Sequence, residues 1–298
     1  MTSCAALTEQ YASLAGVRFC ASRELYPELG GDLPLLVIEN AFSRTVLSLH
    51  GAHLLSFVPN GRPDLLWLSP KAVLEDGKPI RGGIPLCLPW FSEHPQGHPM
   101  HGFARISNWS LEEIDLLEDG RTRIALTLED SEASRMMWPH EFLFRLELVL
   151  GAELMMSLTV ENRSASDAQL SFAFHTYFNV GDVARTTVSG LDDCPYLDKP
   201  DGMQMKMQEG DVDIAAYTDS VYYHVPQTQT IHSPQGEIGI AADNDCAVVW
   251  NAWERDANMA DMGAGNAKGY LCVERGEVFE RAFVLPAGGS YRSSMTLS

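Results

Sequence analysis

Positive charge is scarce in this sequence. Its 298 residues include 21 lysines and arginines against 40 aspartates and glutamates, which gives a net charge of −19. Such a chain repels the phosphate backbone of nucleic acids and the anionic surface of a membrane, so neither is expected as a partner. A small anion stays open as a ligand, because a few converging arginines outweigh a distant surface field that salt screens.

Long apolar runs are absent as well. No segment reaches 18 uninterrupted apolar residues, and the first ten residues have neither a basic region nor an apolar run of signal-peptide length. The six cysteines have no CxxC spacing: Cys4, Cys20, Cys87, Cys194, Cys246 and Cys272. A chain of this length builds a core without disulfide bonds, so we expect reduced cysteines and a cytoplasmic protein.

Cofactor motifs are missing too. The sequence contains neither a GxGxxG fingerprint nor a GxxxxGK[ST] phosphate loop. Its composition, 45% hydrophobic and 20% charged, is typical of a globular protein. Because no linker-like composition shift and no repeat divides the chain, we predict a single domain over residues 1–298.

Short apolar runs, separated by turn sequences such as Pro59-Asn60-Gly61, indicate β-strands. Regular alternation of strands with helices is not seen, which favours an all-β sandwich or barrel over a doubly wound α/β fold. Helix is predicted only locally, at 8–14 and 130–136. The predicted strands are 35–38, 45–57, 123–128, 142–150, 154–160, 169–174, 247–250 and 280–285.

The segment 78–105 is too rich in glycine and proline for regular structure, and long ordered loops of this kind are often functional. Arg81 precedes two glycines, which allow the backbone to approach a ligand closely, and Arg105 follows a His-Gly pair. Each guanidinium can hold an anion through two parallel hydrogen bonds. The alternative is that each arginine pairs with one of the 40 carboxylates.

Three histidines in the same segment, His94, His98 and His101, have a spacing that suggests metal ligands. Glu93 is the nearby carboxylate. The loop offers no helical face that would align the rings, so we do not favour a metal site and expect no cofactor.

Two further ionisable residues lie in apolar surroundings. His175 follows a predicted strand and is flanked by aromatic residues, and Glu274 interrupts an apolar run. A buried glutamate is costly unless it is paired or hydrogen-bonded. A structural ion pair or a catalytic role would each explain it, and His175 is open to both a core and a catalytic interpretation.

Taken in order, several motifs resemble the hexose-6-phosphate mutarotase branch of the aldose 1-epimerase family. They are RGGIP at 81–85, HGFAR at 101–105, FHTYF at 174–178, TDSVY at 218–222, VVWNAWERDANMADM at 248–262 and CVE at 272–274. The resemblance implies a galactose mutarotase-like β-supersandwich with few short helices and no cofactor or metal. It also implies an isomerase that interconverts the α and β anomers of a hexose 6-phosphate.

The resemblance also implies site residues. His175 and Glu274 match the family's catalytic histidine and glutamate, and Arg81 and Arg105 match its substrate-binding arginines. We assign Glu274 as the base that takes the proton of the C1 hydroxyl. His175 is the acid that protonates the ring oxygen.

The remaining substrate-binding positions are looser. The family's sugar-binding aspartate matches Asp219, with Asp198 as the competitor, and His101 matches a second histidine of the galactose mutarotase relatives. Met100 stands where some members have a glutamine, and Gln96 is a candidate substitute.

Other functions stay open at this point. A noncatalytic β-sandwich would bind a sugar phosphate without accelerating anomer exchange, and an aldose 1-epimerase would act on unphosphorylated sugars. A glycoside hydrolase would use two carboxyl groups. For the favoured function we expect a small sugar phosphate as the ligand and a monomeric protein.

Overall fold

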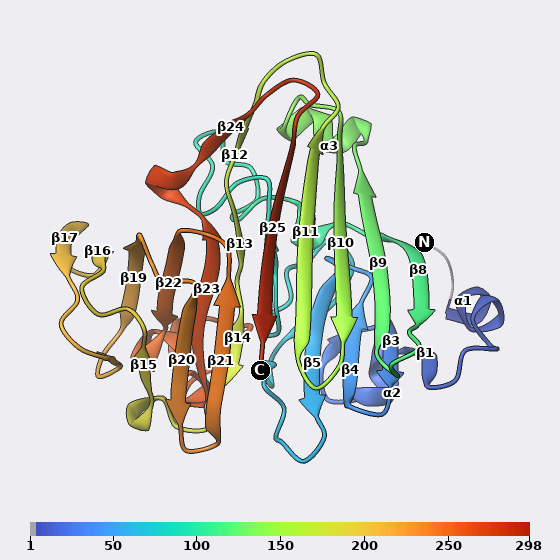
Figure 1. Cartoon of the computed structure of the whole chain (residues 1–298), viewed down its shortest axis with the longest axis horizontal. Coiled ribbons are helices and arrows are strands. Elements are labelled where there is room, and N and C mark those ends of the chain that lie inside the picture. The colour runs from blue at the N-terminus through green and yellow to red at the C-terminus, as the bar shows by residue number, and fades with distance from the viewer. Residues whose placement is uncertain (1–3) are drawn as a thin grey trace.

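Two large antiparallel sheets dominate the computed structural model, which describes residues 4–298 (Figure 1). The prediction of an all-β protein with few short helices is therefore confirmed. The strands of the larger sheet, in spatial order, are β18 (Val212–Asp213), β15 (Thr187–Ser189), β20 (Thr228–Ser233), β21 (Gly236–Ala242), β25 (Ser290–Leu297), β11 (Leu154–Asn162), β10 (Phe142–Leu150), β9 (Thr122–Glu129) and β8 (Ser110–Leu116).

The second large sheet carries the candidate site. Its strands, in spatial order, are β17 (Gln204–Met207), β16 (Pro195–Asp198), β19 (Thr218–Tyr223), β22 (Cys246–Asn251), β23 (Tyr270–Glu277), β13 (Phe172–Phe174) and β7 (Leu86–Cys87), and β14 (Tyr177–Asn179) also pairs with β23. Because β13 and β14 both pair with β23, the short segment between them is held at both ends.

Smaller sheets and short helices complete the fold. The four-stranded sheet has the order β1 (Val17–Ala21), β3 (Pro34–Glu39), β4 (Ser43–Ser48) and β5 (His53–Pro59). Two-stranded pairs are β12 (Ala168–Leu170) with β24 (Phe283–Leu285), and β2 (Gly30–Gly31) with β6 (Val73–Leu74). The helices are α1 (Cys4–Gln10), α2 (Ser22–Leu25) and α3 (Glu132–Met137), with 3₁₀ turns η1 (Ala104–Ile106), η2 (Val183–Arg185), η3 (Trp253–Asn258), η4 (Asn266–Gly269) and η5 (Phe279–Arg281).

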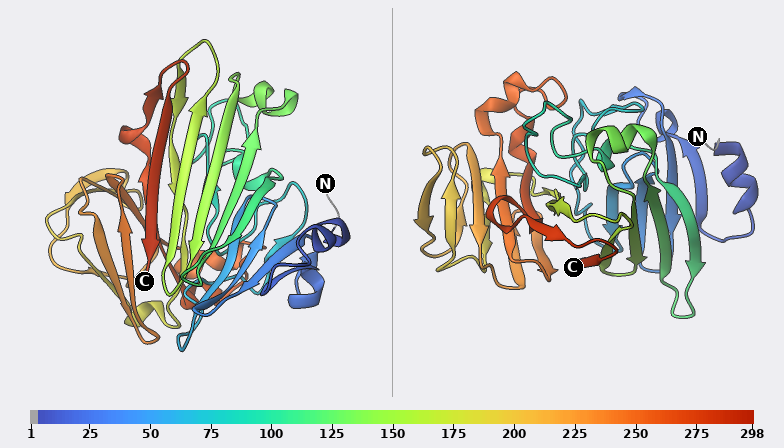
Figure 2. Two further views of the ribbon diagram at one scale, coloured as in Figure 1. Left: turned by 45° about the vertical axis from the view of Figure 1, so that its right-hand side comes forward. Right: turned by 90° about the horizontal axis from the view of Figure 1, so that it is seen from above.

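The main core lies between the two large sheets. Strands β10 and β11 alternate between buried and half-exposed residues along most of their length, as expected for strands with one face on a core. From the other sheet, Val249, Leu271 and Val273 belong to the same apolar cluster. Their neighbours Cys272 and Glu274 therefore project from the opposite face of β23. Figure 2 shows the early strands at one end of the molecule and β16 to β22 at the other.

Several element predictions need correction at their ends. The run 45–57 forms two strands, because Gly51 and Ala52 adopt positive φ angles of 77° and 45° and turn the chain. The helix expected at 8–14 ends at Gln10, and in 280–285 only Phe283–Leu285 is a strand. Helix α3 forms where 130–136 was predicted, and the Ser131 side chain accepts a hydrogen bond from the Ser134 amide at its start.

The cysteine prediction is consistent with the structure over the side chains it describes. Cys87, Cys194, Cys246 and Cys272 are buried and free, and Cys20 is buried. The side chain of Cys4 lies outside the described part. Within residues 4–298, no helix has the length and apolar character that crossing a membrane requires.

Candidate active site

One row of paired residues crosses the second large sheet and defines the face of the candidate site. Asp219 on β19 pairs with Trp250 on β22, Trp250 pairs with Cys272 on β23, and Cys272 pairs with Tyr177 on β14. Directly paired residues of antiparallel strands point to the same face. Glu274 lies two residues beyond Cys272, so it shares this face. Residues from four strands are thus gathered by register alone.

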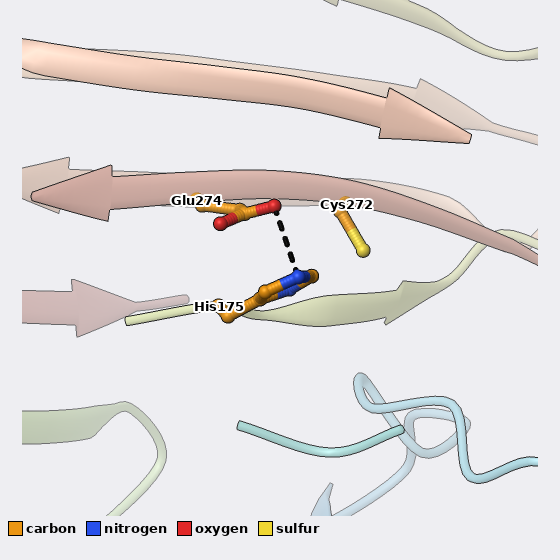
Figure 3. A group of neighbouring side chains, drawn as sticks. All are labelled: His175, Cys272 and Glu274. Atoms are coloured by element: carbon orange, nitrogen blue, oxygen red, sulfur yellow. Dashed lines mark ion pairs between the residues drawn. The ribbon is translucent and has the colours of Figure 1, made fainter. Parts of the chain in front are cut away.

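His175 lies in the interruption between β13 and β14. Pairing with β23 ends at Phe174 and resumes at Tyr177. The His175 amide instead donates to the Pro85 carbonyl at 3.0 Å. Its side chain faces Glu274, with 3.3 Å between Nε2 and Oε1 (Figure 3). The interrupted strand therefore sets the imidazole beside the carboxyl group.

The contact between His175 and Glu274 is almost fully buried, with side-chain exposures of 8% and 2%. Burial, together with the nearby Asp219 carboxylate, raises the pKa of Glu274 well above its ordinary value. Burial, with the His101 ring and the Arg105 guanidinium, lowers the pKa of His175 well below its ordinary value. Both shifts favour an overall neutral pair that holds one proton.

Each residue of this pair has one polar side-chain atom that makes no hydrogen bond within the described part of the chain. Oε2 of Glu274 and Nδ1 of His175 are buried and have no hydrogen-bond partner among the residues that the structure describes. Buried polar atoms without partners are costly, and they are concentrated at sites where a ligand completes the bonding. The pair can therefore accept further hydrogen bonds or metal bonds.

Arg81 supports the histidine through Tyr177. Its Nη1 donates to the Tyr177 hydroxyl at 2.9 Å, and the Tyr177 ring lies parallel to His175, with 5.0 Å between ring centroids and an angle of 3°. Its Nε and Nη2 donate to the two carboxylate oxygens of Asp261 at 3.1 and 3.3 Å. The pairing with a carboxylate that the sequence left open is thus observed. Two of the five guanidinium N–H groups stay available.

Arg105 has a different environment. Its Nη2 donates to the Met100 carbonyl at 2.7 Å, and its buried Nε has no hydrogen-bond partner among residues 4–298. Over the same residues, no carboxylate lies within ion-pair distance of it. Lys199, by contrast, contacts Asp219 at 2.8 Å. Arg105 is therefore the cation of the site with the most unused hydrogen-bond donors.

The glycines beside the two arginines have a structural reason. A Cβ atom on Gly83 would lie 2.0 Å from the Leu54 carbonyl oxygen, and one on Gly102 would lie 2.0 Å from that of Leu88. Both glycines have positive φ angles, 61° and 75°. The sequence suggested close approach to a ligand, whereas the close approach is to the protein's own backbone.

Not all predicted residues meet at this face. Lys206 contacts Asp198 at 2.7 Å, whereas Asp219 is near enough to raise the pKa of Glu274. The geometry therefore favours Asp219 over its competitor. Gln96 is exposed, and its Oε1 lies 3.2 Å from Nε2 of His98. It does not reach the pair in this structure.

The three loop histidines have different neighbours. The His101 ring packs edge-on against His175, with 5.5 Å between centroids. His94 and His98 instead pack near Trp90, at 4.6 and 6.1 Å. His101 therefore packs against a catalytic candidate, whereas the other two histidines, whose spacing suggested a shared metal site, pack against Trp90.

A separate concavity of about 540 Å³ lies away from these residues. It is lined by Asp182, Val183, Ala184, Trp253, Glu254, Asp256, Gly265, Ala267 and Lys268. None of the residues predicted for the site lines it.

Sequence reasoning missed three participants. Cys272 contributes its thiol to a group of potential ligand atoms with His175 and Glu274, all within 4.8 Å of one another. The alternation within Leu271-Cys272-Val273-Glu274 would have indicated its shared face with Glu274. Lys199 had no local signal. Asp261 lies in the 248–262 motif, but its role could not be deduced there because its partner, Arg81, is distant in the sequence.

Comparison with known proteins identifies the family. Residues 34–298 match the sequence profile of the aldose 1-epimerase family. A protein of Escherichia coli named "Putative glucose-6-phosphate 1-epimerase" is 35% identical over 251 residues, which cover 82% of this chain and 83% of the relative. A protein of the same name from Cenchrus ciliaris is 34% identical, covering 84% and 79%.

Solved structures agree with these sequence matches. The crystal structure described as a putative mutarotase from Salmonella typhimurium has a TM-score of 0.82 and 31% identity, covering 89% of this chain and 90% of that one. A galactose mutarotase-like protein from Clostridium acetobutylicum has a TM-score of 0.75 at 14% identity, covering 96% and 99%, and so shares the fold. The predicted galactose mutarotase-like fold is confirmed, and the chain belongs to the aldose 1-epimerase family.

Proposed function

We propose that this chain interconverts the α and β anomers of a hexose 6-phosphate, with glucose 6-phosphate as the substrate to test first. The observation that carries the proposal is the buried contact between His175 and Glu274 at 3.3 Å. The names of the relatives from Escherichia coli and Cenchrus ciliaris support the choice of substrate. Membership of the aldose 1-epimerase family supports the reaction type.

The geometry suits the opening of a cyclic hemiacetal. The C1 hydroxyl oxygen and the ring oxygen are bonded to the same carbon, so they lie close enough to meet two neighbouring protein atoms from one side. Glu274 takes the proton of the C1 hydroxyl while His175 gives a proton to the ring oxygen as the C1–O5 bond breaks. After rotation about the C1–C2 bond, the reverse transfers close the ring on the other face.

One shared proton is sufficient for this cycle. The free pair is neutral, and moving its proton from Glu274 to His175 creates the base and the acid at the same time. Hydrogen bonds from the C1 hydroxyl to the carboxylate and from the imidazolium to the ring oxygen stabilise the charged forms. Nearby Lys199 and Arg105 also lower the cost of the ionised carboxylate. The substrate therefore completes the catalytic protonation state.

The 6-phosphate would be held by Arg105, with Arg81 in a secondary role. Arg105 has no carboxylate partner among the described residues, whereas Arg81 is paired with Asp261. A phosphate oxygen pair fits the planar guanidinium fork. His101 and Asp219 are proposed to contact the sugar hydroxyls, and Gln96 would need its loop to move.

The first test measures anomer exchange of glucose 6-phosphate by exchange NMR, with and without the protein. We expect acceleration at micromolar protein. His175→Asn and Glu274→Gln should each lower kcat by about two to four powers of ten. The double variant should be little slower than either single variant, because the two groups act as a unit.

The outcomes separate the remaining functions. A noncatalytic sugar-phosphate-binding protein would bind glucose 6-phosphate without accelerating exchange, which would contradict the proposal. Folded His175→Asn protein that keeps more than about a third of the wild-type rate would return His175 to a core role.

The second test concerns the phosphate. Arg105→Ala should lower kcat/KM for glucose 6-phosphate by about 10- to 100-fold, since a charge-assisted hydrogen bond contributes about 1.5 to 3 kcal/mol. Activity on free glucose should change far less. Arg105→Lys should recover part of the loss, because it keeps the charge without the planar fork.

If Arg105→Ala lowers activity equally on glucose 6-phosphate and on free glucose, Arg105 has a structural role and does not bind the phosphate. A wild-type preference for free glucose would instead indicate an aldose 1-epimerase of unphosphorylated sugars. Arg81→Ala serves as the comparison, and it should affect both sugars because it also frees Tyr177 and Asp261.

The setting of the reaction is also proposed. The free cysteines fit a reducing compartment, which supports the cytoplasm. All groups of the proposed mechanism come from one chain, which supports a monomer as the working unit.

A further inference from the structure

We propose that the catalytic pair and Cys272 form a binding site for Zn²⁺ and that the metal acts as a reversible inhibitor. The ligands are the Cys272 thiolate, a ring nitrogen of His175 and a carboxylate oxygen of Glu274. The ligand atoms lie within 4.8 Å of one another on three buried side chains (Figure 3). Metal binding stands on this geometry alone, and only its effect on turnover rests on the proposed function.

The donor set is one that zinc prefers. Thiolate, imidazole and carboxylate are its usual protein ligands, and three of them with an open fourth position describe many zinc sites. Ligand atoms around tetrahedral zinc lie about 3.5 Å apart, given metal–ligand distances of about 2.0 to 2.3 Å. His175 and Glu274 already meet this spacing at 3.3 Å. Cys272 needs a shift on the order of 1 Å, which rotation about its Cα–Cβ bond supplies.

Unused bonding capacity points to the same place. Glu274 is 2% exposed, and its Oε2 has no hydrogen-bond partner among residues 4–298. The Cys272 side chain is fully buried beside it. A buried carboxylate oxygen without a partner gains a full bond when a cation arrives, so the metal removes a cost that the free site carries.

Charge balance explains how a buried site accepts a divalent cation. The free site holds a neutral thiol and a neutral pair with one proton. Zinc binding forms bonds from the metal to sulfur, nitrogen and oxygen, breaks the S–H bond and displaces the proton of the pair, and both protons go to solvent. The two positive charges of Zn²⁺ replace those of the two released protons, so the net charge of the site is unchanged.

Two of the three neighbouring cations are neutralised by carboxylates. Lys199 is paired with Asp219 at 2.8 Å, and Arg81 is paired with Asp261 at 3.0 Å. Arg105 is the remaining cation, and its charge opposes that of the metal. The metal would occupy the proton-transfer atoms of His175 and Glu274 directly. Zinc and sugar therefore compete for the same place.

The first readout is spectroscopic and independent of activity. Co²⁺ is added to the chelator-treated, full-length protein, and cobalt bound to a thiolate gives a charge-transfer band in the near ultraviolet. We expect this band in wild type and in Cys246→Ser, a matched control because Cys246 is also fully buried but lies outside the group. The band should be lost in Cys272→Ser. No band in wild type, or a band that survives in Cys272→Ser, would overturn the proposal.

The second readout is inhibition of glucose 6-phosphate anomer exchange by Zn²⁺. Inhibition should be relieved by EDTA and weakened by excess substrate. Cys272→Ser should require at least about tenfold more zinc, since losing even an outer partner of a metal ligand costs about 10- to 100-fold in affinity. Inhibition that glucose 6-phosphate does not relieve would contradict a shared site.

A measurement on wild type removes any dependence on the folding of the variants. Crystals soaked in Zn²⁺ should give an anomalous peak between His175, Cys272 and Glu274. A peak only elsewhere would overturn the proposal. If anomer exchange is not catalysed at all, the cobalt band and this peak still decide the metal site, so its failure is distinct from failure of the proposed function.

Discussion

Histidine has two different roles in this protein, and burial produces both. His175 faces a carboxyl group, whereas Nε2 of His53 lies 2.7 Å from the Gly82 carbonyl oxygen. Burial lowers the pKa of His53 to about 3, although the hydrogen bond to Gly82 opposes the shift. A neutral His53 thus holds the Gly82 carbonyl group, next to Arg81.

This pKa predicts a dependence of stability on pH. The unfolded chain binds a proton on His53 below about pH 6.5, and the folded chain binds it only below about pH 3. Stability is therefore lost as the pH falls from 6.5 towards 3, and at pH 5 this histidine alone costs about 2 kcal/mol. Urea unfolding of wild type and His53→Asn at pH 7.5 and 5 checks the prediction. The variant should lose about 2 kcal/mol less between the two values, and equal losses would contradict it.

At this scale the sequence supplied candidate residues for the site, which stay predictions, and it did not indicate what those residues contact. His175 and Glu274 were placed by their motifs, but nothing local indicated that their side chains touch. The partner of Arg81 is Asp261, whose position depends on how η3 and η4 pack. Cys272 was predictable from strand alternation and was overlooked because a buried cysteine is ordinarily inert.

At the scale of elements, the loop between β6 and η1 determines where both arginines lie. Gly82, Gly83 and Gly102 in this segment pack against neighbouring backbone, and its short strand β7 joins the second sheet beside β13. A loop with this many backbone contacts is fixed from both sides. The many glycines and prolines of this loop would suggest a flexible segment, but its backbone contacts indicate a fixed one.

Gly83→Ala tests this rigidity. Its new Cβ would lie 2.0 Å from the Leu54 carbonyl oxygen, at a backbone φ of 61°. We expect a loss of more than about 3 kcal/mol in unfolding free energy. Gly77→Ala is the matched control, because Gly77 has a φ of 73° with nothing within 4 Å. It should cost about 1 kcal/mol, for backbone strain alone. Similar losses in chemical denaturation would refute the close-packing explanation.

Strand prediction succeeded for strands that have one buried face and one face partly exposed to solvent. The run 142–150 coincides with β10, whose residues alternate along its whole length. It failed for β16 and β17, whose residues are half-buried or exposed and show no alternation. β16 owes its conformation to pairing with β19, and β17 owes its conformation to pairing with β16, which no local pattern contains.

At the scale of the whole molecule, β25 holds the larger sheet together. It pairs with β11 on one side and with β21 on the other (Figure 1). Without it, the strands before residue 163 and those after residue 186 would form two separate sheets. The prediction of one domain over residues 1–298 is consistent with this arrangement and stays a prediction.

Removal of residues 290–298 tests the role of β25. We expect the shortened chain to lose cooperative unfolding and to aggregate, because β11 and β21 would each present an unpaired edge. Arg292→Asp is the control, since this exposed residue lies on the same strand and should change the unfolding free energy by less than about 1 kcal/mol. Thermal unfolding followed by circular dichroism distinguishes the two. A cooperative transition in the shortened chain would contradict the role.

The position of β25 has a consequence for biosynthesis. A ribosome releases β11 and β21 well before residues 290–297, so the nascent chain carries two complementary sheet edges with no strand to fill the gap. Both edges are open to pairing with other nascent chains on the same messenger RNA. The sheet closes only after residues 290–297 have left the ribosome, and until then both edges stay unpaired.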